Sequence, residues 1–116
     1  FTFAAFNVLM PYPGTPFYDR LQREGRLLYE DKWWLHSDFR FNHAPFAPLK
    51  MSPYQLTETA FDIRRQWNAP LSLIRRFLDV QTNLRNLGAM ALFWSYNRLF
   101  RKETFKKQGM GFGYLR

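Results

Sequence analysis

Residues 1–16 read FTFAAFNVLMPYPGTP, and the first ten of them are almost all apolar. A long apolar run without alternation, rich in Phe and Val, is typical of a strand buried on both faces, as in a parallel sheet. We therefore predict a strand over residues 1–10. Because the rest of the sequence shows no strands to pair with it, we expect the neighbouring strands to come from elsewhere and the chain to be a piece of a longer protein.

A proline-rich turn follows the predicted strand. Pro11 ends the strand because proline cannot donate to a ladder of backbone hydrogen bonds, and Gly14 permits the backbone of a sharp turn. Thr15 is a suitable cap for a short helix over residues 16–24, which has a proline at its first position. Gly25 is a suitable residue to end that helix.

Three longer helices are predicted in the second half of the chain. Ser52 and Gln55 form the pattern of a capping box, which marks a helix start. Apolar residues then recur at helical spacing, with proline and glycine as interruptions. We expect helices from Pro53 to Pro70, from Leu71 to Leu87 and, beyond a break at Gly88, from Ala89 to Lys107, with a loose tail over residues 109–113.

The expected fold is mainly α, with a short N-terminal strand followed by a small helical domain of three main helices. Residues 1–25 would form the strand, the turn and the short helix. Residues 26–50 would form an aromatic-rich segment that wraps over other structure, with one helical turn near residues 30–35. Residues 51–116 would form the helical domain.

Composition narrows the range of functions. Aromatic residues make up 20 % of the chain, so there is ample material for a core. Cysteine is absent, which excludes disulfides and cysteine-ligated metal or cluster sites built from this chain alone. No apolar run approaches the about 20 residues of a membrane span. We therefore expect a cytoplasmic location, with peripheral contact to a membrane as an alternative.

The net charge of +8 is confined to the second half of the chain. Residues 1–60 hold six Lys or Arg and six Asp or Glu, whereas residues 61–116 hold eleven and three. Such asymmetry suits an anionic membrane, nucleic acid or an acidic partner, but the interpretation that we favour is a solvated helix face beside a partner that this sequence does not contain. Nucleic acid is the less favoured partner. The aromatic residues cluster in the N-terminal half of the chain and the positive charge in the C-terminal half, whereas a surface that stacks bases has aromatic and basic residues interleaved.

Few residues suggest chemistry. His36 and His43, with Asp31 and Asp38 near them, offer metal-ligand types at a spacing that matches no metal motif. No nucleophile elbow or phosphate-binding glycine loop is present. We therefore predict no catalytic residue and no metal site.

Basic residues also lie within the predicted helices. The pairs Arg64–Arg65 and Arg75–Arg76 either grip phosphates or border an apolar helix face. The third helix, aromatic on one side and basic at its end, suits either an anionic membrane surface or a core with a solvated end.

An ordered set of segments extends over nearly the whole chain and consists of Phe6–Tyr18, Gly25–Leu27, Phe46–Pro48, Met51–Pro53, Asn83–Arg85, Asn97, Arg101–Glu103 and Lys107–Gly109. Together these segments resemble radical S-adenosylmethionine (radical SAM) proteins that also carry a cobalamin-binding domain. Within that family they resemble the hopanoid C-2 methylase group and, more distantly, the magnesium-protoporphyrin monomethyl ester oxidative cyclase group.

The resemblance implies a parent enzyme with an N-terminal cobalamin-binding domain and a partial (β/α) barrel. A Cys-x-x-x-Cys-x-x-Cys motif in the parent would hold a [4Fe-4S] cluster that cleaves S-adenosylmethionine. This sequence lacks those cysteines, so it would hold no cofactor alone and have no independent activity. Residues 1–10 would be the last barrel strand, and residues 33–46 would line or cover the substrate opening.

The same resemblance implies a cofactor contact at the end of that strand. In related barrels this backbone and the turn after it lie near the adenine of S-adenosylmethionine. The residues implied are Leu9, Met10, Pro11, Tyr12 and Gly14. The alternative is that the Pro-Gly-Thr-Pro stretch only shapes the turn.

The expected function is thus the C-terminal accessory or capping region of a cobalamin-dependent radical SAM enzyme, of methyltransferase or oxidoreductase type. Its partners would be the barrel and the cobalamin-binding domain, and the isolated chain would tend to self-associate. The alternative is a free-standing basic helical module that binds an anionic membrane surface or nucleic acid.

Overall fold

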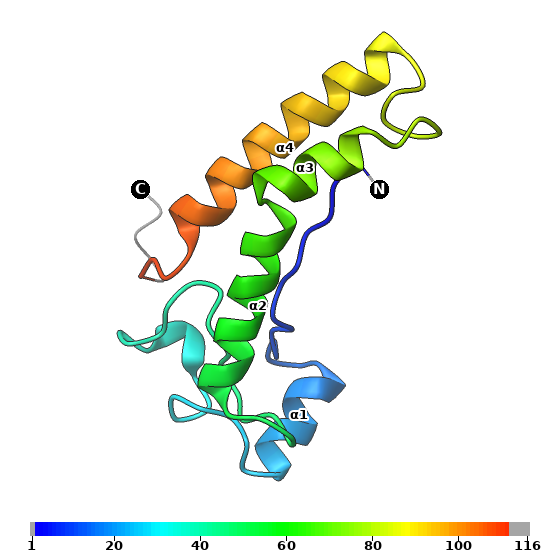
Figure 1. The fold of residues 1–116 in the computed structure, drawn as a ribbon. Coiled ribbons are helices and arrows are strands. Elements are labelled where there is room, and N and C mark those ends of the chain that lie inside the picture. Colours follow the sequence, from blue (N-terminus) through cyan, green and yellow to red (C-terminus); the bar gives the residue numbers. More distant parts are fainter. Residues whose placement is uncertain (1, 112–116) are drawn as a thin grey trace. The chain divides into compact units, whose positions relative to one another are not determined.

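The computed structural model describes residues 2–111 and is mainly helical, which confirms the mainly α part of the expected fold (Figure 1). Over these residues no strand is assigned, and β pairing is limited to the isolated antiparallel bridges Leu27–Phe46 and Arg40–Gly111. The elements in order are α1 (Pro16–Arg23), the 3-10 helix η1 (Trp33–Leu35), α2 (Pro53–Trp67), α3 (Pro70–Phe77) and α4 (Leu87–Lys107).

The predicted strand over residues 1–10 is wrong for residues 2–10, which are extended but belong to no sheet. Burial on both faces is also wrong, because burial alternates along the segment. Val8 is buried, whereas Phe3 is 41 % exposed and Leu9 is 66 % exposed. The segment therefore has the period of two of a strand with one covered face.

Side chains take the place of a neighbouring strand along the first part of this segment. The Thr2 carbonyl accepts hydrogen bonds from Asn97 Nδ2 at 2.8 Å and from Arg76 Nη1 at 3.3 Å. The Phe6 carbonyl accepts one from Arg64 Nε. Isolated donors satisfy single carbonyls without forming a ladder, so the segment is held in place but is not part of a sheet.

The described chain divides into two compact units. We call residues 2–6 and 61–107 the helical unit, and residues 7–60 with 108–111 the aromatic unit. The boundary after residue 60 falls within α2. The predicted segments 1–25 and 51–116 therefore each contribute to both units, whereas residues 26–50 lie wholly in the aromatic unit.

The turn and helix at the start of the aromatic unit form as predicted. Gly14 has a φ of 80° and Gly25 a φ of 64°, both in the left-handed region that favours glycine. Thr15 caps α1, and its side-chain oxygen accepts from the Tyr18 N–H at 3.3 Å. The predicted helical turn near residues 30–35 is present as η1.

The aromatic unit closes around an apolar core. Two backbone hydrogen bonds flank the Leu27–Phe46 bridge and bring the ends of the aromatic-rich segment together, from the Leu28 N–H to the Pro45 carbonyl and from the Ala47 N–H to the Arg26 carbonyl. The core cluster consists of Val8, Tyr18, Leu21, Leu27, Ala44 and Phe46.

Helix α2 starts at the predicted capping box. The Ser52 hydroxyl accepts from the Gln55 N–H at 3.1 Å, and the Gln55 side chain accepts from the Ser52 N–H at 2.8 Å. Each side chain thus satisfies a backbone donor that a helix start would leave without a partner.

The second long helix is shorter than predicted, because α3 ends at Phe77 and not at Leu87. Asp79 starts a turn in which its carboxylate accepts from the Gln81 N–H at 3.1 Å. A hydrogen bond from the Thr82 side chain lowers the pKa of Asp79 and keeps it ionised. Such local side-chain bonds compete with helix continuation.

The next helix starts with a cap that the sequence analysis missed. The Asn86 side-chain oxygen accepts from the Ala89 N–H at 2.8 Å, so Asn86 caps α4, and residues 78–86, not a break at Gly88, separate the two helices. Gly88 itself lies in the first turn of α4.

Helices α3 and α4 lie side by side in the helical unit (Figure 1). Phe93 is fully buried and packs on Phe77, with ring centroids 5.4 Å apart. Within residues 2–111, no helix combines the length and apolar character required to cross a membrane.

Candidate functional site

The structure brings three of the five sequence-predicted contact residues together in a hollow of the aromatic unit. Leu9, Met10 and Tyr12 line a space of about 510 Å³. Trp33 and Phe41 from the aromatic-rich segment contribute to the same wall. We call this space the segment-end hollow, because the extended segment ends there.

Pro11, the fourth predicted residue, is buried and does not line the hollow. Its carbonyl accepts a hydrogen bond from the buried Trp33 Nε1 at 2.9 Å. The Tyr12 ring meets the Trp33 ring edge to face, with centroids 5.8 Å apart. Trp33 therefore fixes both the backbone and the aromatic wall at this point.

Gly14, the fifth predicted residue, does not line the hollow. It lies in the turn after Tyr12, whose carbonyl accepts from the Thr15 N–H at 3.2 Å and from the Thr15 hydroxyl at 2.7 Å. At Gly14 the structure supports the turn-shaping role, because its φ of 80° suits glycine.

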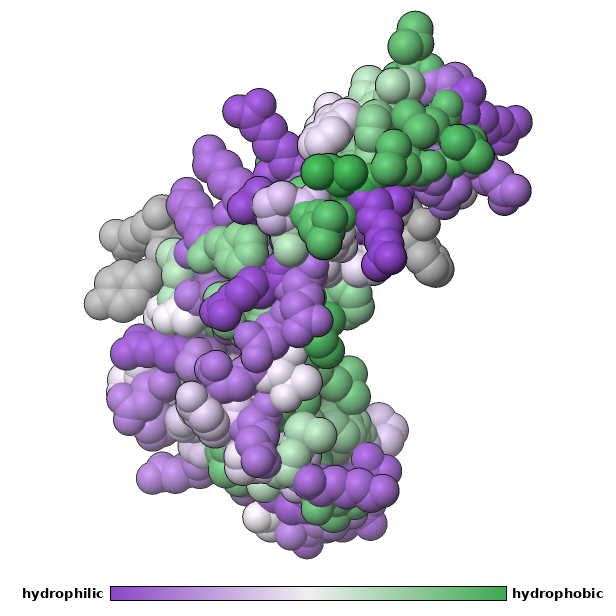
Figure 2. Space-filling model, viewed as in Figure 1, coloured by the Kyte–Doolittle hydropathy of each residue, from purple (hydrophilic) through white to green (hydrophobic). Residues whose placement is uncertain are grey.

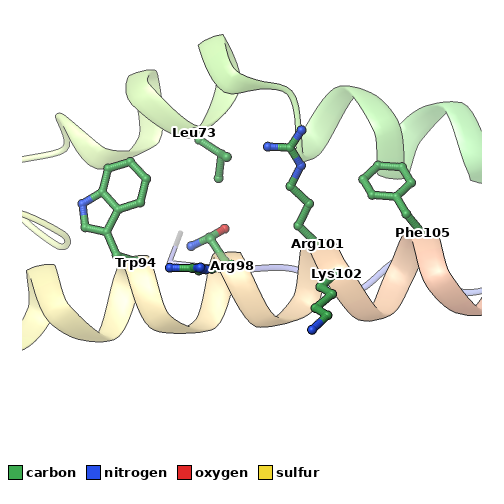
Figure 3. Close-up of a pocket in the computed structure, with 7 residues that line it drawn as sticks. Leu73, Trp94, Arg98, Arg101, Lys102 and Phe105 are labelled. Carbon is green, nitrogen blue, oxygen red and sulfur yellow. The ribbon is translucent and has the colours of Figure 1, made fainter.

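A second candidate site is a groove in the helical unit, shown in Figure 3 and referred to below as the α4 groove. It has a volume of about 560 Å³. Trp94, Arg98, Arg101 and Phe105 follow each other on α4 at steps of four, three and four residues, which places them on one helix face. The lining residues are Leu73, Trp94, Asn97, Arg98, Arg101, Lys102 and Phe105.

The walls of the α4 groove are held by packing. Leu73, on α3, is 8 % exposed and points toward α4 (Figure 3). The Trp94 ring packs on Phe77, with centroids 5.2 Å apart, and the Phe105 ring meets Phe61 edge to face at 6.2 Å. Both rings still expose area, with Trp94 48 % and Phe105 38 % exposed.

Three cationic side chains are among the residues that line the groove. Within residues 2–111, Arg98, Arg101 and Lys102 form no ion pair. The nearest acidic residue in sequence, Glu103, instead binds Lys107 at 2.7 Å, and that contact lowers the pKa of Glu103. Arg98 and Arg101 thus border an apolar space without an ion-pair partner in the described chain.

Sequence reasoning missed the α4 groove. It assigned the aromatic residues and the positive charge to different halves of the chain, although α4 interleaves them on one face. The steps of four, three and four residues from Trp94 to Phe105 were the signal that could have revealed it.

In each of the pairs Arg64–Arg65 and Arg75–Arg76, one arginine binds backbone carbonyls of the chain itself. Arg76 contacts the Thr2 and Trp67 carbonyls, and its guanidinium lies 4.0 Å from the centroid of the Trp67 ring. Arg64 is buried and contacts the Phe6 carbonyl. Burial lowers the pKa of both guanidinium groups, but arginine stays charged at neutral pH.

The histidines do not converge on a metal site. His36 accepts a hydrogen bond from the Asp38 N–H at 3.2 Å. Burial lowers the pKa of His43, an effect that Glu58 opposes. Across the part of the chain that the structure describes, no three His, Cys, Asp or Glu residues form a group that could hold a metal ion.

Comparisons with known proteins give no relative for this chain: no family model, no curated protein and no solved structure matches it. Any assignment of function therefore depends on the residues and on the two spaces described above.

Proposed function

We propose that this chain is the C-terminal accessory and capping region of a cobalamin-dependent radical SAM enzyme, of methyltransferase or oxidoreductase type, without catalysis of its own. The open edge of the extended segment carries this proposal. Within the described chain, no backbone N–H of residues 2–10 donates a hydrogen bond, while Phe3 and Leu9 are exposed. An unpaired edge with apolar side chains is suited to pairing with a strand of the parent barrel.

The residues present do not fit the iron-sulfur cluster of such an enzyme, because the chain has no cysteine. The cluster and the cobalamin would therefore be held by the rest of the parent. No step of the reaction is assigned to this chain.

The segment-end hollow does fit a flat heteroaromatic ring such as the adenine of S-adenosylmethionine. The exposed Tyr12 ring supplies an aromatic surface for stacking, and its edge-to-face contact with the buried Trp33 ring holds it in place. The backbone groups of Leu9 and Met10 lack backbone partners within the described chain and can pair with a ring edge. The role proposed for this region is to bind and orient the adenine.

The partners in this proposal are the barrel and the cobalamin-binding domain, and the location is cytoplasmic. The isolated chain would self-associate through exposed apolar side chains such as Phe3, Leu9 and Leu87. Sedimentation of the isolated chain tests this expectation. A strictly monomeric profile without binding of a hydrophobic dye would contradict it.

The first experiment is to read the gene upstream of the codon for Phe1 and to purify the native polypeptide. We expect an open frame that includes a Cys-x-x-x-Cys-x-x-Cys motif, and a product whose iron-sulfur cluster is visible by electron paramagnetic resonance after reduction. A frame that lacks this motif would refute the proposal. In that case the alternative, a free-standing basic module for an anionic membrane or nucleic acid, would take its place.

The second experiment tests the segment-end hollow in that native polypeptide. Tyr12→Ala removes one stacking surface, so we expect the Kd for S-adenosylmethionine to rise about tenfold, which corresponds to about 1.4 kcal/mol. Leu35→Ala is the matched control, because Leu35 is 73 % exposed and does not line the hollow. An unchanged Kd in Tyr12→Ala, with the cluster spectrum intact, would exclude the hollow as the adenine site.

A further inference from the structure

We propose that the α4 groove binds an anionic phospholipid at a bilayer surface. Arg98 and Arg101 would contact the phosphate, and an acyl chain would lie against Leu73, Trp94 and Phe105. This inference concerns the helical unit alone and holds whether or not the chain belongs to a longer enzyme.

The groove combines two properties that few ligands satisfy together. Its volume of about 560 Å³ lies in the range of small-ligand pockets. Its floor and ends are apolar, while Arg98 and Arg101 border it without ion-pair partners in the described chain. A free inorganic anion would leave the apolar walls in water, and a neutral hydrocarbon would leave the cations without a counter-charge. An anionic amphiphile satisfies both.

Figure 3 shows how the side chains divide these roles. Leu73 from α3 and Trp94, Arg101 and Phe105 from α4 point into the space between the helices. Lys102 points away from that space, where it can meet a second headgroup on the membrane surface.

The surface of the same unit favours a bilayer over a nucleic acid or an acidic peptide. Leu71 and Ile74 on α3 and Leu78, the residue that follows the helix, are 78 %, 51 % and 61 % exposed. Figure 2 shows apolar side chains gathered over the α3 and α4 region. A nucleic acid would leave this apolar surface in water, whereas hydrocarbon and headgroups together cover it.

Charge supports the same partner. Residues 61–107 hold ten Lys or Arg and three Asp or Glu. Two of those acidic residues are already paired, Asp62 with Arg65 and Glu103 with Lys107. Basic segments of this kind are attracted to anionic leaflets, and tryptophan, here Trp94, favours the interface between lipid and water.

The test is co-sedimentation of the intact chain with vesicles at about 0.1 M salt, a concentration at which surface charges are partly screened. Vesicles of phosphatidylcholine alone are compared with vesicles in which phosphatidylglycerol replaces a third of the lipid. We expect binding to the anionic vesicles, and at least a tenfold rise in Kd for the double variant Arg98→Gln, Arg101→Gln. The control, Lys32→Gln with Lys50→Gln, also removes two exposed charges and should raise Kd less than threefold.

A second readout locates the acyl chain. Lipids brominated in their acyl chains should quench the fluorescence of the bound chain, and Trp94→Phe should remove a large part of that quenching while far-UV circular dichroism stays unchanged. Two results would overturn the proposal. One is equal weakening by both double variants, which would indicate charge attraction without a site. The other is tighter binding to a single-stranded oligonucleotide than to the anionic vesicles.

Discussion

The two units of this chain are built on different principles. The aromatic unit buries Val8, Leu21 and Phe46 in one apolar cluster. The helical unit buries Asn83, Asn97 and other polar groups beside Leu73 and Phe93 and leaves large apolar side chains outside, among them Leu87, which is 84 % exposed. The first unit is thus organised around an apolar cluster and the second around buried polar groups, while both expose large apolar side chains, such as Leu49 in the first and Leu87 in the second.

The two units also differ in the kind of interaction that stabilises them. An apolar core is held mainly by burial, which is not directional. The helical unit depends on a network of hydrogen bonds. Asn97 and Arg76 donate to the Thr2 carbonyl, Arg76 also donates to the Asn97 side-chain oxygen, Asn83 donates to the Arg76 carbonyl, and the Thr2 hydroxyl donates to the Asn83 side-chain oxygen. Such bonds impose one geometry, because a buried polar group without a partner costs free energy.

The largest loss of stability is expected for Trp33→Ala in the aromatic unit. Trp33 is 2 % exposed, and its removal leaves a cavity and deprives the Pro11 carbonyl of its donor. We expect a loss of about 3–5 kcal/mol in the free energy of unfolding, measured by urea denaturation. Leu35→Ala, in the same 3-10 helix but 73 % exposed, should stay within about 0.5 kcal/mol.

Hydrogen exchange then shows whether the two units respond separately. Trp33→Ala should remove protection from residues 7–60 and leave most of it over residues 61–107. Equal loss of protection in both ranges would mean that the units unfold together.

The second largest loss of stability is expected for Arg76→Met in the helical unit. This change keeps an apolar stem but leaves the Trp67 carbonyl and the Asn97 side-chain oxygen without their arginine donor. We expect destabilisation of about 1–3 kcal/mol in the same urea experiment. Arg75→Met is the matched control, since Arg75 is exposed and should change stability by less than about 0.5 kcal/mol. Similar values for the two neighbours would show that the polar network is not what orders this unit.

A smaller loss of stability is expected when a helix cap is removed, and it should be similar in the two units. Asn86→Ala removes the cap of α4 and should cost about 1 kcal/mol. Ser52→Ala removes one half of the capping box of α2 and should cost about the same. Thermal unfolding of both variants measures these losses of stability. If only one variant is destabilised, the contribution of a cap depends on the core around it.

The features that sequence reasoning found are those that neighbouring residues determine. The cap at Thr15 and the capping box at Ser52 and Gln55 need only a few residues, so their pattern is sufficient to predict them. Asn86 was missed because Gly88 was taken as the break, although the cap side chain lies two residues earlier.

The features that sequence reasoning missed depend on residues far apart in the chain. A strand was expected over residues 1–10, but the partners of the Thr2 carbonyl are Arg76 and Asn97, which no local pattern identifies. Leu9, Met10 and Tyr12 were named from the sequence as cofactor contacts, which stays a prediction, but the hydrogen bond from Trp33 to Pro11 beside the space that they line was not foreseen. The α4 groove also needs Leu73 from another helix.

The smallest change in stability is expected when the pH is lowered, and it should be confined to the aromatic unit. Burial lowers the pKa of His43 below its ordinary value of 6.5, an effect that Glu58 opposes and Arg40 reinforces. As pH falls through 6.5 the unfolded chain binds a proton at this residue before the folded chain does, so the free energy of unfolding decreases. The decrease stops once pH lies below the folded pKa of His43.

His43→Gln should therefore flatten the dependence of urea midpoint on pH between about 7.5 and 5.5, a range set by the ordinary histidine value. His36→Gln should leave that slope in place, since His36 contacts Asp38 at the surface. Hydrogen exchange at the two pH values should show the loss of protection near residues 40–58 and little change in α4, because His43 and Glu58 both belong to the aromatic unit. A slope that survives His43→Gln would assign the acid sensitivity to the carboxylates, and an equal response in α4 would mean that the two units share one stability after all.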